Sequence, residues 1–372
     1  MLGCGRGPPG HAIAVLLAEG TRRLLGQRVA VALAIGGPHE RGDDVEVPFA
    51  DVGGLAPELG EAEVDVQLKE VDARRVICHC VHARDRVGRT RVRHMGEIRV
   101  GPSGLPDAAS FEEAAQALAA SGYRACEIGF VSGFWLDYEA APQLGEALRA
   151  ADVALSVHAP LAAFMGHVGR EKKFKMALGM LDHTAGLAKA AGAELIVFHP
   201  GFLLGRERER AIADVVDQLG DLRERLESKD RLVPFGVEVM GRARELGTID
   251  DVLAIASQVD FVRPVLDFAH MHATSDGAYT DVDAFASVLA ATDDLLEPGA
   301  PFHIHFSDIA FANRNETKHL PYGEGTLRVE PLRDSLARFE RPATVISESP
   351  DSLSTQTIGS VLIGDIAARR TS

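Results

Sequence analysis

Acidic and imidazole side chains end several apolar runs of this chain. In "RPVLDFAH", Asp267 and His270 follow a stretch with the composition of a core strand. Burying such groups costs free energy unless they are paired or bound to a metal ion. The same residue types end five other runs, as His158 in "SVHAP", His199 in "VFHPG", Glu238 in "GVEVMG", His305 in "HIHFSD" and Glu348 in "SESPD", and His319 lies in "ETKHLPYGEG". Mixed imidazole and carboxylate ligands suit zinc, with manganese, iron or cobalt as alternatives.

A regular pattern of elements from Met95 onward can bring these residues together. Apolar runs of about five residues alternate with amphipathic stretches of about 10–20 residues. Strands are expected at 97–101, 125–130, 153–158, 194–199, 234–238, 263–267, 302–306 and 343–348, and helices at 109–121, 142–151, 172–191, 206–228, 248–258, 281–293, 328–339 and 353–368. Eight such units predict an α/β fold, a (β/α)₈ TIM barrel. A doubly wound open sheet is the alternative, but no G-x-G-x-x-G follows the first strand.

In such a barrel the carboxyl ends of all strands meet at one mouth, where active sites lie. The polar residues at these ends would therefore converge, and divalent cations would relieve the repulsion among so many charges. His303 and His305 differ by two positions and point the same way from one strand. His305 lies nearer the mouth, so we expect it to be the ligand and His303 to support it from the barrel interior.

Composition narrows the classes of function. The chain has 372 residues and a net charge of −15, which argues against a protein that coats DNA at ordinary salt. An acidic surface fits a high-salt cytoplasm or a small anionic substrate held by metals. The four cysteines suggest no disulfide framework, so a reducing, cytoplasmic location is expected. No apolar run reaches the roughly 18 residues of a membrane span.

The first 94 residues differ from the rest. They contain one aromatic residue, Phe49, of the 21 in the chain, and aromatic residues dominate core burial. We expect residues 1–94 to be an extension that is loosely ordered, accessory or not natively translated, and residues 95–372 to form the metal-dependent barrel. The barrel should fold and bind metal without the extension.

The order of these motifs resembles the endonuclease IV type of apurinic/apyrimidinic (AP) endonuclease, AP endonuclease family 2, within the xylose-isomerase-like TIM barrels. The resemblance covers about residues 97–365 and is carried by "VHAP", "VFHPG", "GVE", "LDFAH", "HFSD", "KHLPYGEG" and "SESP". It implies a zinc-dependent phosphodiesterase of base excision DNA repair that cuts DNA 5′ to abasic sites. It also implies two to three zinc ions, with manganese possible, and a monomer that acts on DNA.

The resemblance assigns a role to each residue. It implies that His158 and His199 bind one metal and that Glu238 bridges this metal to a second. Asp267, His305 and Glu348 would complete the second site, and His270 and His319 would hold a third metal. It also implies that Glu238 and Glu348 are catalytic. The family has an Asp two residues before the last His, where this chain has Thr317. Glu316, Glu324 or a water would substitute for it. Replacing Thr317 with Asp is expected to raise zinc affinity at that site.

Two other classes of function remain open. Sugar isomerases and epimerases of the same superfamily keep a Glu–Asp–His–Glu set for one divalent ion and generally lack His270 and His319. The acidic surface favours this alternative, and the number of ligands favours the endonuclease. A nucleic-acid-binding barrel without catalysis is the third class, and the intact Glu238 and Glu348 argue against it.

Two loops are candidates for contacts with DNA. The loop "FVSGFWLDY" offers Phe134, Trp135 and Tyr138 for wedging or stacking, and "LAAFMGHVGREKKFK" offers Arg170, Lys172, Lys173 and Lys175 for phosphate. Burial of the aromatic residues beneath the loop and a solvated lysine face of a helix are the equally weighted alternatives.

Overall fold

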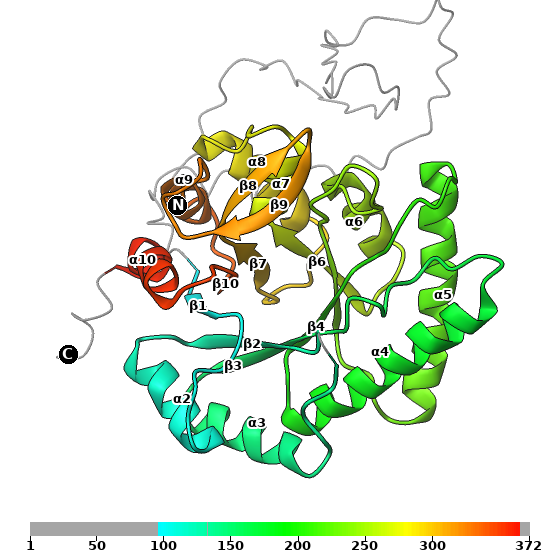
Figure 1. Cartoon of the computed structure of the whole chain (residues 1–372), viewed down its shortest axis with the longest axis horizontal. Helices are drawn as coiled ribbons and strands as arrows, with labels where there is room; N and C mark the ends of the chain where they lie inside the picture. The colour runs from blue at the N-terminus through cyan, green and yellow to red at the C-terminus, as the bar shows by residue number, and fades with distance from the viewer. Residues whose placement is uncertain (1–95, 132, 365–372) are drawn as a thin grey trace, which may run out of the picture. The chain divides into compact units, whose positions relative to one another are not determined.

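A computed structural model describes residues 96–131 and 133–364 (Figure 1). Eight parallel strands form one sheet in the order β1-β10-β7-β6-β5-β4-β3-β2. The strands are β1 (Ile98–Pro102), β2 (Ala125–Gly129), β3 (Ala154–His158), β4 (Leu195–Phe198), β5 (Phe235–Glu238), β6 (Val262–Asp267), β7 (Phe302–Phe306) and β10 (Ala343–Ser347). The predicted (β/α)₈ barrel is confirmed. The extension expected at residues 1–94 lies outside the described residues.

Helices surround the sheet, and all but α10, which follows the last strand, lie between successive strands (Figure 1). They are α2 (Phe111–Ala120), α3 (Ala140–Ala150), α4 (Glu171–Ala191), α5 (Arg208–Ser228), α6 (Ile249–Ala256), α7 (Phe268–Thr274), α8 (Val282–Asp293), α9 (Glu330–Leu336) and α10 (Ser352–Ile363). Side-chain caps fix several of their first turns, as in α6, where Thr248 and Asp251 form a capping box. Within the described part of the chain, no helix is long and apolar enough to cross a membrane.

The barrel closes between β1 and β2, the two ends of the strand order. A bridge pairs Ser103 with Glu127, and the N–H of Gly104 donates to the carbonyl oxygen of Glu127 over 2.7 Å. Gly101 makes the approach of the two strands possible, because a Cβ atom there would lie 1.6 Å from the carbonyl oxygen of Ala125. Closure matters for the site, since it brings the end of β2 to the same mouth as the other strands.

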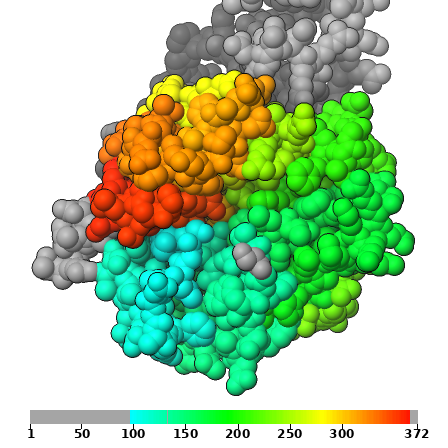
Figure 2. Space-filling view, in the orientation of Figure 1, coloured from blue at the N-terminus to red at the C-terminus, as the bar shows by residue number. Residues whose placement is uncertain are grey.

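The sequence reading did not anticipate the hairpin that follows β7. It consists of β8 (Asp308–Ala312) and β9 (Asn315–Leu320), joined by Asn313 and Arg314. Both turn residues have positive φ, 51° and 60°, which is the backbone of a two-residue type I′ turn. The segment containing the hairpin, orange in Figure 2, stands at the surface next to the red helix α10. His319 therefore comes from β9, outside the eight-stranded sheet.

We predict that Gly101→Ala destabilises the barrel. The new methyl group would collide with the backbone of β2, and overpacking of this kind typically costs about 1–3 kcal/mol or more. Gly179→Ala in α4 is the matched control, because a Cβ atom at Gly179 meets nothing within 4 Å and alanine favours a helix. Thermal unfolding should give a lower Tm for Gly101→Ala and an equal or higher Tm for Gly179→Ala. Equal Tm values for wild type and Gly101→Ala would contradict this account of closure.

Candidate metal centre

Three groups of potential metal-ligating side chains meet at the mouth of the barrel. Within each group the candidate ligand atoms lie within 4.8 Å of one another. The groups are His158, His199 and Glu238; Glu238, Asp267, His305 and Glu348; and His270, Glu316 and His319. All eight residues expected to bind metal therefore belong to one of these groups, and Glu316 joins them.

Glu238 is shared by the first two groups. Its Oε2 atom lies 3.1 Å from Nε2 of His158 and 2.9 Å from Nε2 of His199. Its Oε1 atom lies 2.9 Å from Nδ1 of His305. One oxygen thus faces each group, which is the arrangement that a carboxylate bridging two cations requires.

Asp267 positions two of the groups at once. Its Oδ1 atom accepts a hydrogen bond of 2.7 Å from the backbone N–H of His270, so it caps α7 directly after β6. Its Oδ2 atom is buried and has no hydrogen-bond partner, although Nδ1 of His270 lies 3.2 Å away. A buried carboxylate oxygen without a hydrogen bond fits a cation ligand.

In the third group the third candidate ligand is Glu316. The family resemblance had pointed instead to the next position, where the family has an aspartate and this chain has Thr317. The Oε2 atom of Glu316 lies 2.8 Å from Nε2 of His270, and its Oε1 atom lies 3.3 Å from Arg242. Thr317 is exposed, and its hydroxyl donates to the carbonyl oxygen of Ala310. The geometry therefore favours Glu316 over Thr317, and it removes the basis for expecting that an Asp at 317 would strengthen zinc binding. Of the other proposed substitutes, Glu324 is exposed and belongs to no group.

Backbone carbonyl groups select the nitrogen atoms that face the centre. Nδ1 of His158 lies 2.9 Å from the carbonyl oxygen of Ala159, and Nδ1 of His270 lies 2.8 Å from that of Val239. A carbonyl oxygen only accepts, so each Nδ1 carries the proton and each Nε2 faces its carboxylate. Such outer contacts fix the tautomer of a metal-binding histidine. The site therefore fits divalent cations in three respects. The Nε2 atoms of neutral His158 and His270 are free of the proton, Oδ2 of Asp267 has no hydrogen bond, and the donors are a mixture of imidazoles and carboxylates.

The electrostatics of the mouth agree with this fit. Burial alone would raise the pKa of Glu238, but His305, His158 and His199 hold it well below its usual range. Burial alone would lower the pKa of His158, but its hydrogen bond to Glu238 and the charge of Glu238 raise that pKa to about 9. Burial raises the pKa of Asp267 to about 6. The carboxylates and imidazoles thus share protons that a cation would displace.

A cavity of about 360 Å³ opens above these groups. Half-buried or exposed apolar side chains line one part of it, among them Val131, Leu161 and Phe202. Among the described residues that line it, Arg242 is the single arginine or lysine. The cavity thus joins a strongly polar floor to an apolar rim.

Sequence reading missed Glu127. It lies in β2, is 1% exposed and forms a further group with His303 and His305. Burial alone would raise its pKa, but His305 and His303 lower it, so the carboxylate is ionised. The signal was present in "RACEIGF", where a glutamate interrupts an apolar strand.

We predict that metal binding weakens as the pH falls. A proton occupies His158 up to about pH 9 in the metal-free protein, so a cation must displace it, and affinity should rise with pH toward that value. Affinity should fall further below about pH 6, where Asp267 becomes protonated. Zinc titration in weak buffer measures both the affinity and the protons released. An affinity that stays constant over this range would show that the imidazoles are not ligands.

We also predict that Glu316→Gln removes one ion and leaves the groups around Glu238 loaded, because the amide lacks the charge that pairs with His270. Thr317→Asp is the comparison, and its metal content should equal that of the wild type. Mass-spectrometric metal analysis of purified protein measures both. Loss of metal from Thr317→Asp, or none from Glu316→Gln, would reverse this assignment.

Comparisons with known proteins identify the family of the chain. A family model described as xylose isomerase-like TIM barrel matches residues 115–359. An uncharacterized protein of Methanocaldococcus jannaschii is 29% identical over 253 residues, which are 67% of this chain and 91% of that protein. A probable endonuclease 4 of Enterococcus faecalis is 29% identical over 182 residues, which are 47% of this chain and 59% of that protein.

Solved structures share the fold. An endonuclease IV from Thermus thermophilus matches with a TM-score of 0.54 and 18% identity, over 72% of this chain and 97% of that one. A D-tagatose 3-epimerase-like protein matches with a TM-score of 0.55 and 18% identity, over 71% of this chain and 97% of that one. Because identities this low show the fold alone, the two structures do not decide between reactions. The family match, the eight-stranded barrel and the convergent mouth together show that this chain belongs to the xylose isomerase-like TIM barrel family.

Proposed function

We propose that the protein is a metal-dependent phosphodiesterase that cuts DNA 5′ to abasic sites, as in base excision repair. One observation carries this proposal, namely that Glu238 joins two ligand groups and that a third group stands beside them. A single-ion site would need only Glu238, Asp267, His305 and Glu348. The additional imidazoles of His158, His199, His270 and His319 are accounted for if two or three ions bind. The ligand types favour zinc, with manganese as the alternative.

In the proposed hydrolysis, Glu238 and Glu348 have different roles. Bound divalent ions would supply Lewis acidity and a nucleophilic water of lowered pKa. Glu238 would hold two of the ligand groups at a fixed separation, because each of its oxygens faces one of them. Glu348 borders the cavity, with 19% of its side chain exposed, and would orient the attacking water toward the phosphodiester.

Trp135 is the most exposed of the three aromatic residues in the loop after β2 that were considered for contacts with DNA. It is 52% exposed, and its Nε1–H donates to the carbonyl oxygen of Gly129, a residue that lines the cavity. Phe134 and Tyr138 instead pack against His183 with ring centroids 4.5 Å and 5.3 Å away. Trp135 is therefore the first of the three to test for a wedging or stacking contact with DNA.

A sugar epimerase or isomerase is the second candidate. Two observations favour it, namely that Glu238, Asp267, His305 and Glu348 form a complete group and that Arg242 is the one basic side chain among the described residues of the cavity lining. In this reading the first and third groups would hold no ion that the reaction needs.

We predict that Glu238→Gln loses at least one ion and nearly all incision of an oligonucleotide with one abasic site, because a neutral amide cannot balance two dications. His303→Ala is the comparison, with an expected loss of about 10–100-fold, because His303 touches Glu127 rather than Glu238. Metal content is measured on the same samples.

Two results would contradict the proposal. If Glu238→Gln keeps its metal and its rate while His303→Ala loses both, the ligand assignment fails. If the wild type leaves the oligonucleotide uncut but interconverts ketoses or epimerises them with one bound ion, the sugar-converting function replaces the nuclease.

A further inference from the structure

Glu127 lies in the barrel interior beneath the ligands at the mouth. Its Oε2 atom accepts a hydrogen bond of 2.7 Å from the hydroxyl of Ser156 and lies 3.2 Å from Nε2 of His303. Its Oε1 atom lies 3.1 Å from Nε2 of His305. A charged carboxylate in a barrel interior is strongly destabilising unless such partners compensate for it. The burial of Glu127 therefore depends on its contacts with Ser156, His303 and His305.

His305 stands between two buried carboxylates. Its Nε2 faces Glu127, whereas its Nδ1 lies 2.9 Å from Glu238 and 3.5 Å from Glu348. A neutral imidazole carries one proton, so Nδ1 has a lone pair for a metal only if the proton is on Nε2. Oε1 of Glu127, 3.1 Å from Nε2, is placed to accept a hydrogen bond from a proton on that nitrogen.

We propose that Glu127 is the positioning residue that keeps the proton of His305 on Nε2 and directs its Nδ1 toward Glu238, Asp267 and Glu348. This inference rests on the proposed metal centre but not on the reaction that the centre catalyses. His158 and His270 rely on backbone carbonyl oxygens for the same purpose. A charged partner makes an imidazole a more basic ligand than a carbonyl partner does, so His305 should hold its ion most firmly.

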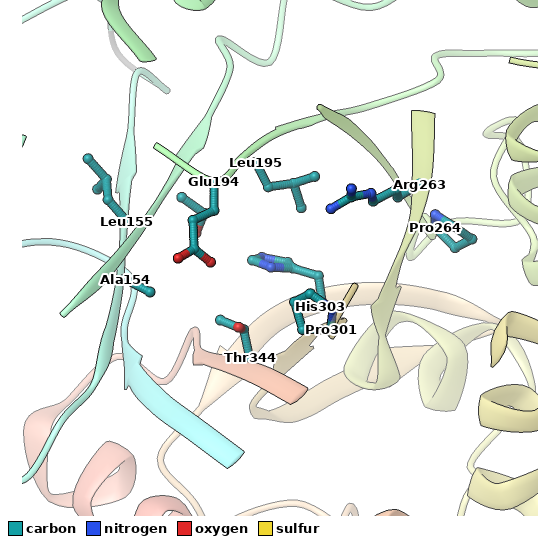
Figure 3. A pocket seen from close by; sticks show the side chains of 10 residues that line it. Ala154, Leu155, Glu194, Leu195, Arg263, Pro264, Pro301, His303 and Thr344 are labelled. Carbon is teal, nitrogen blue, oxygen red and sulfur yellow. The ribbon is translucent and has the colours of Figure 1, made fainter. Parts of the chain in front are cut away.

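A metal ion bound by Glu127, His303 and His305 is the alternative to a proton on Nε2 of His305. Oε1 of Glu127 and Nε2 of His305 are close, yet neither has an aligned hydrogen bond. His303 also lines a small cavity of about 40 Å³, together with Leu195, Arg263 and Thr344 (Figure 3). An ion held by Glu127, His303 and His305 themselves would use the same atoms. That arrangement excludes a proton on Nε2 of His305, so the two can be told apart.

The first test uses the zinc-loaded wild-type protein. With ¹⁵N-labelled histidine, long-range ¹H–¹⁵N NMR spectra should show a proton on Nε2 of His305 and a metal-shifted Nδ1, with the resonance assigned by its loss in His305→Gln. Anomalous scattering from zinc should show an ion beside Nδ1. A proton on Nδ1, or an ion between Glu127 and His303, would overturn the proposal whether or not any Glu127 variant folds.

The second test is Glu127→Gln, which keeps the size of the side chain and removes its charge. Zinc affinity of one ion, measured by competition with a chelator, should fall about 10–100-fold, and the Nε2 proton signal of His305 should change. Ser156→Ala is the matched control, because it removes one donor to Glu127 but leaves the contact with His305. Its zinc affinity should remain within about threefold of the wild type, well below the loss expected for an outer-contact variant.

The outcomes separate the two proposals. A wild-type protein that binds no zinc or manganese would remove the proposed function. A wild type that binds zinc, with Glu127→Gln binding it equally tightly and with an unchanged His305 spectrum, would remove only the role of Glu127. Equal losses in Ser156→Ala and Glu127→Gln would also remove it, because the effect would then come from packing rather than from the His305 contact.

Discussion

The mouth of this barrel depends on the burial of Glu238. The residue is 1% exposed and its carboxylate is ionised, so its charge must be balanced inside the protein. Three imidazoles from three different strand ends provide that balance, those of His158, His199 and His305. The parallel strands of the barrel bring these strand ends to one point. The fold and the composition of the site therefore constrain each other.

Sequence reading predicted the features that follow from periodicity. Alternating apolar runs and amphipathic stretches indicated the eight strands, because a buried parallel strand and a helix that covers it have distinct patterns. The residues at strand ends were predicted for the same reason, since the position of a residue at the end of a β-strand fixes which edge of the sheet it joins. His158, His199, Glu238 and Asp267 are of this kind.

This reasoning could not choose among Glu316, Glu324 and a water for the third group, and it did not find Glu127. The role of Glu316 depends on the register of the β8–β9 hairpin, which is irregular between Ala310 and Phe311. In this register Glu316 faces His270 and Thr317 is exposed, whereas the family resemblance pointed to position 317. Glu127 was missed because it lies within a strand, one layer below the mouth, and its partners Ser156 and His303 are 29 and 176 residues away in sequence.

The hairpin carries ligands of the third group, so this group can change in evolution independently of the barrel strands. Two members of the third group, Glu316 and His319, come from β9, whereas the first two groups come from the barrel strands or from their ends. A change in a short surface ribbon can therefore add or delete a ligand without altering the sheet that supports the others. Such modularity offers a route by which one barrel lineage could pass between centres with different numbers of ions, each intermediate chain remaining folded.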